Sequence, residues 1–216
     1  MKHDSKHIKA LVFDMDGTLW DATESYAEVW NESMRQLGIC RSVNVADLHK
    51  LMGAPVDAMI DFLVGTDHLG MSHDEFLGLL YTNERTMMPR LGGILYPGVF
   101  DGFVRLSSHY RLMLLSNCSP NGLINFMGYT GLGPFVADHI CYGDSPRPKS
   151  ENLRILLERN GITSAEAVYV GDTQSDCYEA HKAGTIFALM EYGFGNADDA
   201  DLRFASFHSL TEYFEI

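Results

Sequence analysis

Short apolar runs alternate along the chain with longer stretches in which apolar residues recur every three or four positions. The runs at 8–13, 110–116, 139–142, 168–171 and 185–189 are predicted strands, and the periodic stretches at 121–129, 150–160 and 174–183 are predicted helices. Strands and helices in alternation build a parallel sheet whose two faces are covered by helices. The pattern therefore predicts an α/β fold.

One long segment departs from this alternation. Between residues 21 and 89 the pattern gives four helix-like stretches, at 23–37, 45–51, 56–64 and 72–88, and no convincing strand. We therefore predict an all-helical cap at 21–89, inserted into an α/β core formed by 1–20 and 90–216. Gly92 and Gly93, which follow the segment, are suited to a hinge.

The composition narrows the class of partner. The 216 residues are 46% hydrophobic, which is ample for a packed core, and 29 acidic against 16 basic residues give a formal net charge of −13. The basic residues never form a run, so we expect no nucleic-acid partner. The first apolar run is too short for a signal-peptide core or a membrane span, so we expect a cytoplasmic protein.

Two acids follow the first predicted strand, in the run LVFDMDGT at 11–18. In an extended segment residues two apart point the same way, so Asp14 and Asp16 would face one site. Gly17 permits a tight turn, and Thr18 adds a hydroxyl beside an open N–H, which suits an anionic oxygen. The run suggests magnesium-assisted phosphoryl chemistry, although a hydrophobic strand followed by an ordinary Asp-Gly turn has the same sequence.

Three further segments carry polar residues at the carboxyl ends of predicted strands, the edge where open α/β sheets bind ligands. Ser116 and Asn117 offer a hydroxyl and backbone N–H groups to a phosphoryl oxygen. Lys149 precedes a helical stretch, Asp172 enters a glycine-opened turn, and Asp176 follows one helical turn later. Singly, the serine and the two acids are also explained as helix caps, and a lone lysine as a surface group. Their occurrence together, in this order, indicates a site.

These segments resemble the four motifs of the haloacid dehalogenase-like superfamily: DMDGT at 14–18, a strand-end serine, a lysine, and GDTQSD at 171–176. The helical segment falls where the phosphoglycolate phosphatase-like branch carries its small cap, so the resemblance implies a Rossmann-like core with an inserted cap. The branch often shows Lys-Pro-x-Pro at the third motif, where this chain has PKSENL at 148–153. Arg147 therefore remains an alternative to Lys149 as the active-site cation.

The resemblance implies a magnesium-dependent phosphatase that acts on a small phosphorylated metabolite, phosphoglycolate-like or a sugar phosphate. Asp14 would be the nucleophile that forms an aspartyl-phosphate, and Asp16 the general acid and base. Mg²⁺ would be held by Asp14, the backbone carbonyl of Asp16, and Asp172.

The resemblance also implies a cradle for the phosphoryl oxygens. Its members would be Gly17, Thr18, Ser116, Asn117 and Lys149. Asp176 would orient the lysine or a metal-bound water.

Substrate discrimination is expected in the cap, with Trp20, Glu24 and Gly53 as candidates that face the site, although Trp20 is also explained by packing at a domain junction. Two other functions stay open. A sugar-phosphate mutase of the same superfamily would show bisphosphate-dependent isomerisation. A non-catalytic binding or regulatory protein would show no magnesium-dependent hydrolysis of p-nitrophenyl phosphate. We expect a monomer or a weak homodimer.

Overall fold

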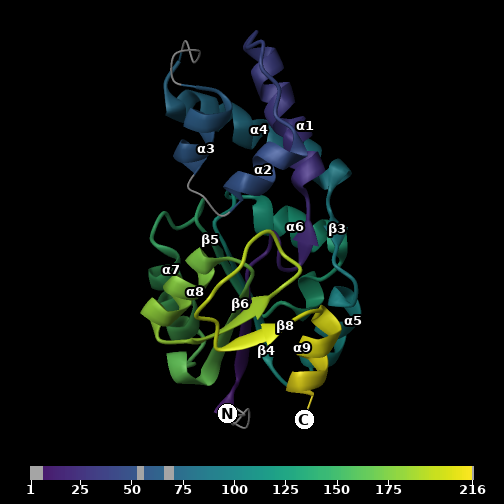
Figure 1. The fold of residues 1–216 in the computed structure, drawn as a ribbon, viewed down its shortest axis with the longest axis vertical. Coiled ribbons are helices and arrows are strands. Elements are labelled where there is room, and N and C mark those ends of the chain that lie inside the picture. The colour runs from purple at the N-terminus through teal and green to yellow at the C-terminus, as the bar shows by residue number, and fades with distance from the viewer. Residues whose placement is uncertain (1–6, 53–55, 66–70, 216) are drawn as a thin grey trace.

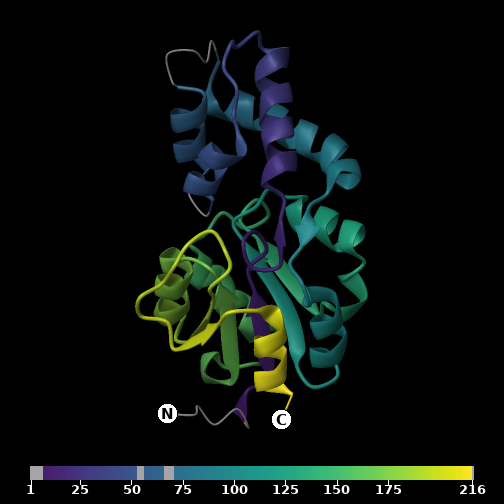
Figure 2. The same cartoon turned by 45° about the vertical axis from the view of Figure 1, so that its right-hand side comes forward.

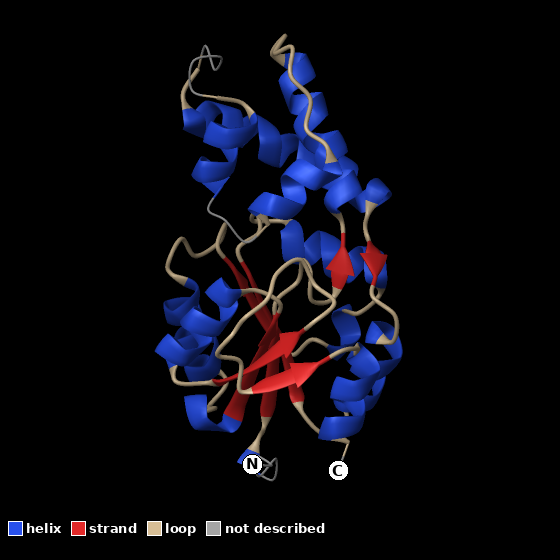
Figure 3. Ribbon diagram, in the orientation of Figure 1, coloured by secondary structure: helices blue, strands red, loops and turns tan. Residues whose placement is uncertain are grey.

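A computed structural model of the protein describes residues 7–52, 56–65 and 71–215. Its centre is a six-stranded sheet in which every neighbouring pair is parallel (Figures 1 and 3). In sheet order the strands are β5 (Asp138–Cys141), β4 (Arg111–Ser116), β1 (Ala10–Phe13), β6 (Ala167–Gly171), β7 (Ile186–Met190) and β8 (Leu202–Phe204). The α/β prediction is therefore confirmed.

Helices cover both faces of the sheet because successive strand residues point to opposite sides. In β1, Leu11 and Phe13 belong to one apolar cluster, whereas Ala10 and Val12 belong to the other. The first cluster includes residues of α5 (Val99–Leu106), α6 (Gly122–Thr130) and α9 (Phe207–Phe214), and the second those of α7 (Lys149–Arg159) and α8 (Gln174–Ala183). Burying a phenylalanine such as Phe13 contributes about 1.5–3 kcal/mol, so two such layers hold the central strand firmly.

The described residues between Asp21 and Ile94 form four helices. They lie above the carboxyl edge of the sheet, as Figures 1 and 2 show. They are α1 (Thr23–Gln36), α2 (Val45–Leu51), α3 (Val56–Leu63) and α4 (His73–Leu91). The first and the last pack together through the Trp30 and Phe76 rings and through a hydrogen bond that Asn83 Nδ2 donates to Ser33 Oγ. Below them, β2 (Trp20–Asp21) and β3 (Ile94–Leu95) pair antiparallel where the chain leaves and re-enters the sheet region.

The helices of this segment match the predicted all-helical pattern, and its division from the core stays a prediction. Helix α4 continues through Pro89 to Leu91, so a boundary after residue 89 falls inside a helix. The helix ends at Gly92, whose φ of +64° favours glycine. Within the described ranges, no helix is both long and apolar enough to cross a membrane.

Candidate active site

Three neighbouring strands deliver polar residues to one edge of the sheet. Because β1 lies between β4 and β6, Asp14 after β1, Ser116 at the end of β4 and Asp172 after β6 come side by side. All three are buried. The sheet order therefore brings these strand ends together, as the sequence predicted.

The turn after β1 is fixed by close packing against Asp172. Gly17 has φ of +81°, and a Cβ there would lie 2.3 Å from Asp172 Oδ2, so both conformation and space require glycine. Thr18 Oγ1 donates to Asp172 Oδ1 at 3.3 Å, and the Thr18 carbonyl accepts from the Tyr192 hydroxyl at 2.6 Å. The structure thus places the Thr18 hydroxyl against Asp172, not among the residues that line the pocket.

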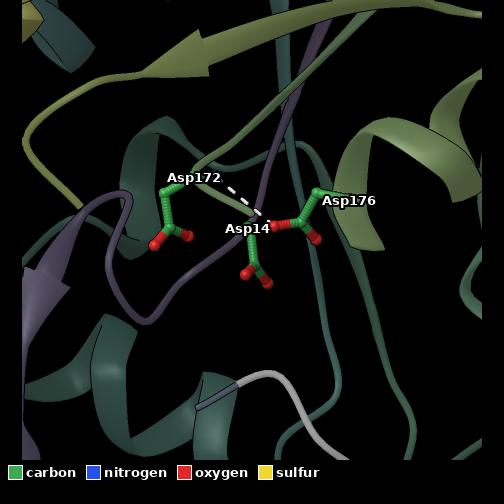
Figure 4. Close-up of side chains that lie close together, drawn as sticks. All are labelled: Asp14, Asp172 and Asp176. Atoms are coloured by element: carbon green, nitrogen blue, oxygen red, sulfur yellow. Dashed lines mark hydrogen bonds between the residues drawn. The ribbon is translucent and has the colours of Figure 1, made fainter. Parts of the chain in front are cut away.

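Three carboxylates gather where the strands end (Figure 4). Asp14, Asp172 and Asp176 each offer one oxygen, and these oxygens lie within 4.8 Å of one another. Burial raises the pKa of Asp14 to about 6 and that of Asp172 to about 8, and Asp176 adds to both rises because its negative charge disfavours a second one nearby. Asp14 Oδ1 is buried, and Lys149 Nζ lies 3.3 Å from it.

This donor set fits a hard divalent cation. Carboxylate oxygens are the ligands that Mg²⁺ prefers, and three buried carboxylates gathered within 4.8 Å carry more negative charge than Lys149 neutralises. The expected set was Asp14, Asp172 and the backbone carbonyl of Asp16, and the cluster of side-chain oxygens adds Asp176 to the first two. The Asp16 carboxyl is turned elsewhere because its Oδ1 accepts a hydrogen bond from Trp20 Nε1 at 2.9 Å.

Lys149 is the cation that reaches these acids. Its Nζ lies 2.7 Å from Asp176 Oδ1 and 3.3 Å from Asp14 Oδ1, and it is buried at the start of α7. Burial alone would lower the pKa of Lys149, but the charges of the two acids outweigh it and hold that pKa well above its usual value. Arg147 is exposed and donates to Ser145 Oγ, so the structure brings Lys149 to the carboxylates.

Asp176 makes the contacts of both interpretations that its sequence position allowed. Its Oδ2 accepts from the backbone N–H and the hydroxyl of Thr173, which caps α8, while Oδ1 accepts from Lys149. Burial opposes its negative charge, yet Lys149 and these hydrogen bonds together lower the pKa of Asp176. Capping and orientation of the lysine are thus two uses of one carboxylate.

Asp16 differs from Asp14 in its surroundings. Burial, followed by the charge of Asp14, raises the pKa of Asp16 well above its usual value, although the Trp20 hydrogen bond opposes the rise. Asp16 therefore holds a proton more tightly than an ordinary aspartate does, next to an Asp14 whose ionised form Lys149 favours. Trp20 itself is 1% exposed and packs edge-on against Phe126, so it lies behind Asp16 and does not line the pocket.

The loop after β7 supplies support that the sequence analysis missed. Phe194 N donates to Asp172 Oδ2 at 2.7 Å, and a Cβ at Gly193 would lie 2.3 Å from the Asp172 Cβ. The available signal was the run YGFGN at 192–196, two glycines directly after a predicted strand.

A pocket opens between this edge of the sheet and the four helices above it. On the sheet side it is lined by Asp14, Asp16, Ser116, Asn117, Cys118, Ser119, Tyr142, Lys149, Asp172, Thr173 and Phe194. On the helical side it is lined by Tyr26, Trp30, Leu48, Met52, Val56, Met59, Leu80, Tyr81 and Glu84.

Glu24 and Gly53 are two of the residues predicted to face the site from the cap. Glu24 is exposed on α1 and is not among the lining residues, so its placement gives no support to a role in the pocket. Gly53 lies outside the described residues. The buried Glu84 of α4 was missed, because one acid within an amphipathic helix carries no signal that it faces a cavity.

Known proteins share this chain's sequence pattern and fold. Residues 11–190 match the haloacid dehalogenase-like hydrolases. A phosphoglycolate phosphatase from Rhodobacter capsulatus is 26% identical over 208 residues, which cover 94% of this chain and 93% of the relative. A haloacid dehalogenase-like family hydrolase from Streptococcus pneumoniae shares the fold with a TM-score of 0.82 at 19% identity, covering 97% of this chain and 99% of its own.

A second solved structure, CbbY from Rhodobacter sphaeroides in complex with phosphate, shares the fold with a TM-score of 0.81 at 19% identity. It covers 94% of this chain and 96% of its own. The matching segment spans the strand-end acids, the lysine and the intervening helices described above. The chain therefore belongs to the haloacid dehalogenase-like hydrolase family, in its phosphoglycolate phosphatase-like branch.

Proposed function

We propose that the protein is a magnesium-dependent phosphoric monoester hydrolase that acts on a small phosphorylated metabolite through an aspartyl-phosphate on Asp14. The observation that carries the proposal is the pairing of two neighbouring carboxyls whose surroundings differ. Lys149 Nζ lies 3.3 Å from Asp14 Oδ1 and favours the ionised form of Asp14, whereas burial and the charge of Asp14 raise the pKa of Asp16 well above its usual value. A nucleophile beside an acid is the pair that this reaction requires.

In the first step, an Asp14 oxygen attacks phosphorus as the bond between phosphorus and the ester oxygen breaks. Asp16 donates its proton to the departing alkoxide, which leaves as an alcohol. In the second step, Asp16, now a carboxylate, takes a proton from a water molecule whose oxygen attacks the same phosphorus. The bond from phosphorus to Asp14 breaks, phosphate leaves, and both acids return to their starting forms.

The remaining residues of the site would stabilise the negative charge of the phosphoryl oxygens. Lys149 would neutralise the phosphoryl oxygens near Asp14, and Ser116 and Asn117 would donate hydrogen bonds to them. Thr18 would act indirectly, by holding Asp172.

Asp14, Asp172 and the backbone carbonyl of Asp16 would hold Mg²⁺, since the oxygens of Asp176 already accept from Lys149 and Thr173. When bound, the ion reduces the repulsion between the Asp14 carboxylate and an anionic phosphate.

The test is hydrolysis of p-nitrophenyl phosphate with Mg²⁺ or with EDTA. We expect Mg²⁺-dependent turnover that falls by at least about 10²–10⁴-fold in Asp14→Asn, because an amide is a poor nucleophile. Asp101→Asn, an exposed acid on α5, is the matched control and should keep the wild-type rate. Acid-quenched wild-type protein should carry one phosphoryl group that Asp14→Asn lacks. Near-normal turnover in Asp14→Asn would overturn the assignment, as would the absence of hydrolysis with every divalent ion.

A further inference from the structure

The helical wall of the pocket faces the place where a leaving group would lie. Once the phosphoryl group is at Asp14, the rest of the ester must extend toward this wall. It is largely apolar and aromatic, with Trp30, Leu48 and Leu80 almost fully buried. Such a surface favours contact with the carbon skeleton of a substrate, because apolar groups are removed from water there.

Glu84 is the one charged residue on this wall among the described residues that line the pocket. Its side chain is 9% exposed and hydrogen-bonds Ser119 of the loop after β4. Burial raises the pKa of Glu84 to about 7, and the Ser119 hydrogen bond opposes that rise. At pH 8 the wall therefore presents a poorly solvated carboxylate to the leaving group.

No described cation on the helical side compensates for this acid. Lys149 is the positively charged residue among the described lining residues, and it lies against Asp14 and Asp176. Of the basic residues in this segment, Arg35 pairs with Glu32, Arg41 donates to the Val64 carbonyl and Lys50 pairs with Asp47. Arg85 and Arg90 of α4 are exposed and are not among the lining residues.

A second anionic group on the substrate would thus be buried next to Glu84 without a positive partner. Burial of an unpaired charge is costly, and a like charge nearby increases the cost. A hydroxyl or an amino group at the same place would instead donate a hydrogen bond to the carboxylate. The pocket consequently distinguishes leaving groups by their charge.

We propose that Glu84 determines specificity by excluding anionic leaving groups, so that the substrate is the phosphate ester of a small alcohol that bears a hydrogen-bond donor and no second anion. This proposal rests on the proposed phosphatase function. It separates this chain from a phosphoglycolate-specific enzyme, since the glycolate leaving group carries a carboxylate.

Three two-carbon esters test the proposal: 2-hydroxyethyl phosphate, O-phosphoethanolamine and phosphoglycolate. They differ at the terminal group, which is a hydroxyl, an ammonium and a carboxylate. We expect kcat/KM at pH 8 with Mg²⁺ to be at least about tenfold higher for one or both of the first two than for phosphoglycolate. Where turnover is too slow to measure, inhibition constants against p-nitrophenyl phosphate should follow the same order.

The variant Glu84→Gln removes the charge and keeps an acceptor for Ser119. It should raise the kcat/KM ratio of phosphoglycolate to 2-hydroxyethyl phosphate by at least about tenfold. Glu28→Gln, the same change at an exposed position of α1, should leave this ratio unaltered. A purely structural role for Glu84 would change the rates for all three esters in parallel.

Two results would overturn the specificity: a wild-type preference for phosphoglycolate, or an unchanged ratio in Glu84→Gln. Hydrolysis of p-nitrophenyl phosphate separates this failure from that of the proposed function. If that ester is hydrolysed and phosphoglycolate is preferred, the role of Glu84 is wrong and the phosphatase function stands. If it is not hydrolysed with any divalent ion, the phosphatase function is wrong.

Discussion

Replacement of Glu84 by glutamine should stabilise the metal-free protein, and increasingly so as the pH rises. The carboxyl is buried between α4 and the loop after β4, and burial raises its pKa from 4.5 to about 7. The folded protein therefore binds a proton at Glu84 more tightly than the unfolded chain does. Between these two pKa values, the free energy of unfolding of the wild type falls as the pH rises.

The magnitude follows from the size of this pKa change. One pKa unit corresponds to 1.36 kcal/mol, so a change from 4.5 to about 7 costs the folded state on the order of 3 kcal/mol once Glu84 is ionised. Glutamine cannot ionise and avoids this cost. The stability difference between Glu84→Gln and the wild type should thus grow from about pH 4.5 to pH 7 and stay constant above it.

Urea unfolding in EDTA, at half-unit steps from pH 4.5 to pH 8.5, measures this difference. EDTA removes the contribution of a bound cation. The charge of Glu84 also raises the pKa of Asp16, and this interaction adds to the same pH-dependent difference. Glu28→Gln should show no such pH-dependent gain. A difference between Glu84→Gln and wild type that is constant across this pH range would refute the reasoning, because an ordinary glutamate pKa at position 84 would then be required.

Two further predictions concern packing around the site. Lys149→Met should destabilise the metal-free protein by about 3–5 kcal/mol because it leaves buried carboxylates unpaired. Adding Asp176→Asn should restore part of that loss, as measured by urea unfolding. If the changes in free energy of unfolding of the two single variants simply add in the double variant, the ion pair is contradicted. Gly92→Ala should lower the stability of the protein more than Gly38→Ala does. Both glycines have positive φ, but only a Cβ at Gly92 meets a side chain, the Tyr129 ring at 2.0 Å. Thermal unfolding compares the two variants, and equal losses would show that φ strain alone decides.

The sequence by itself was sufficient for the parallel sheet and for the acids at its edge. Both depend on local periodicity: alternation within β1 points Leu11 and Phe13 to one face, and the parallel order brings Asp14 and Asp172 to the same edge. Elements with few residues were missed, among them the two-residue strands β2 and β3 and the three-residue strand β8. A period cannot be recognised over two or three positions.

Tertiary structure decided how the polar groups are shared within the site. From the sequence, Lys149 was the first choice for the cation with Arg147 as the alternative, and Asp176 had two competing interpretations. Packing of α7 against α8 places the lysine between two acids and lets the carboxylate of Asp176 both cap a helix and hold the lysine. These outcomes depend on which elements pack against one another. The spacing of residues along a single helix does not give that information.

The position of Glu84 is the clearest case of a feature that only the fold supplies. In the sequence it is one acid among others on α4, and a helical pattern separates buried from exposed faces without saying what a buried face contacts. Its burial, its raised pKa and its place in the pocket arise because α4 packs over the sheet edge next to Ser119. Local backbone preferences thus fixed the elements and the strand-end acids, whereas the charge character of the pocket came from contacts between segments distant along the chain.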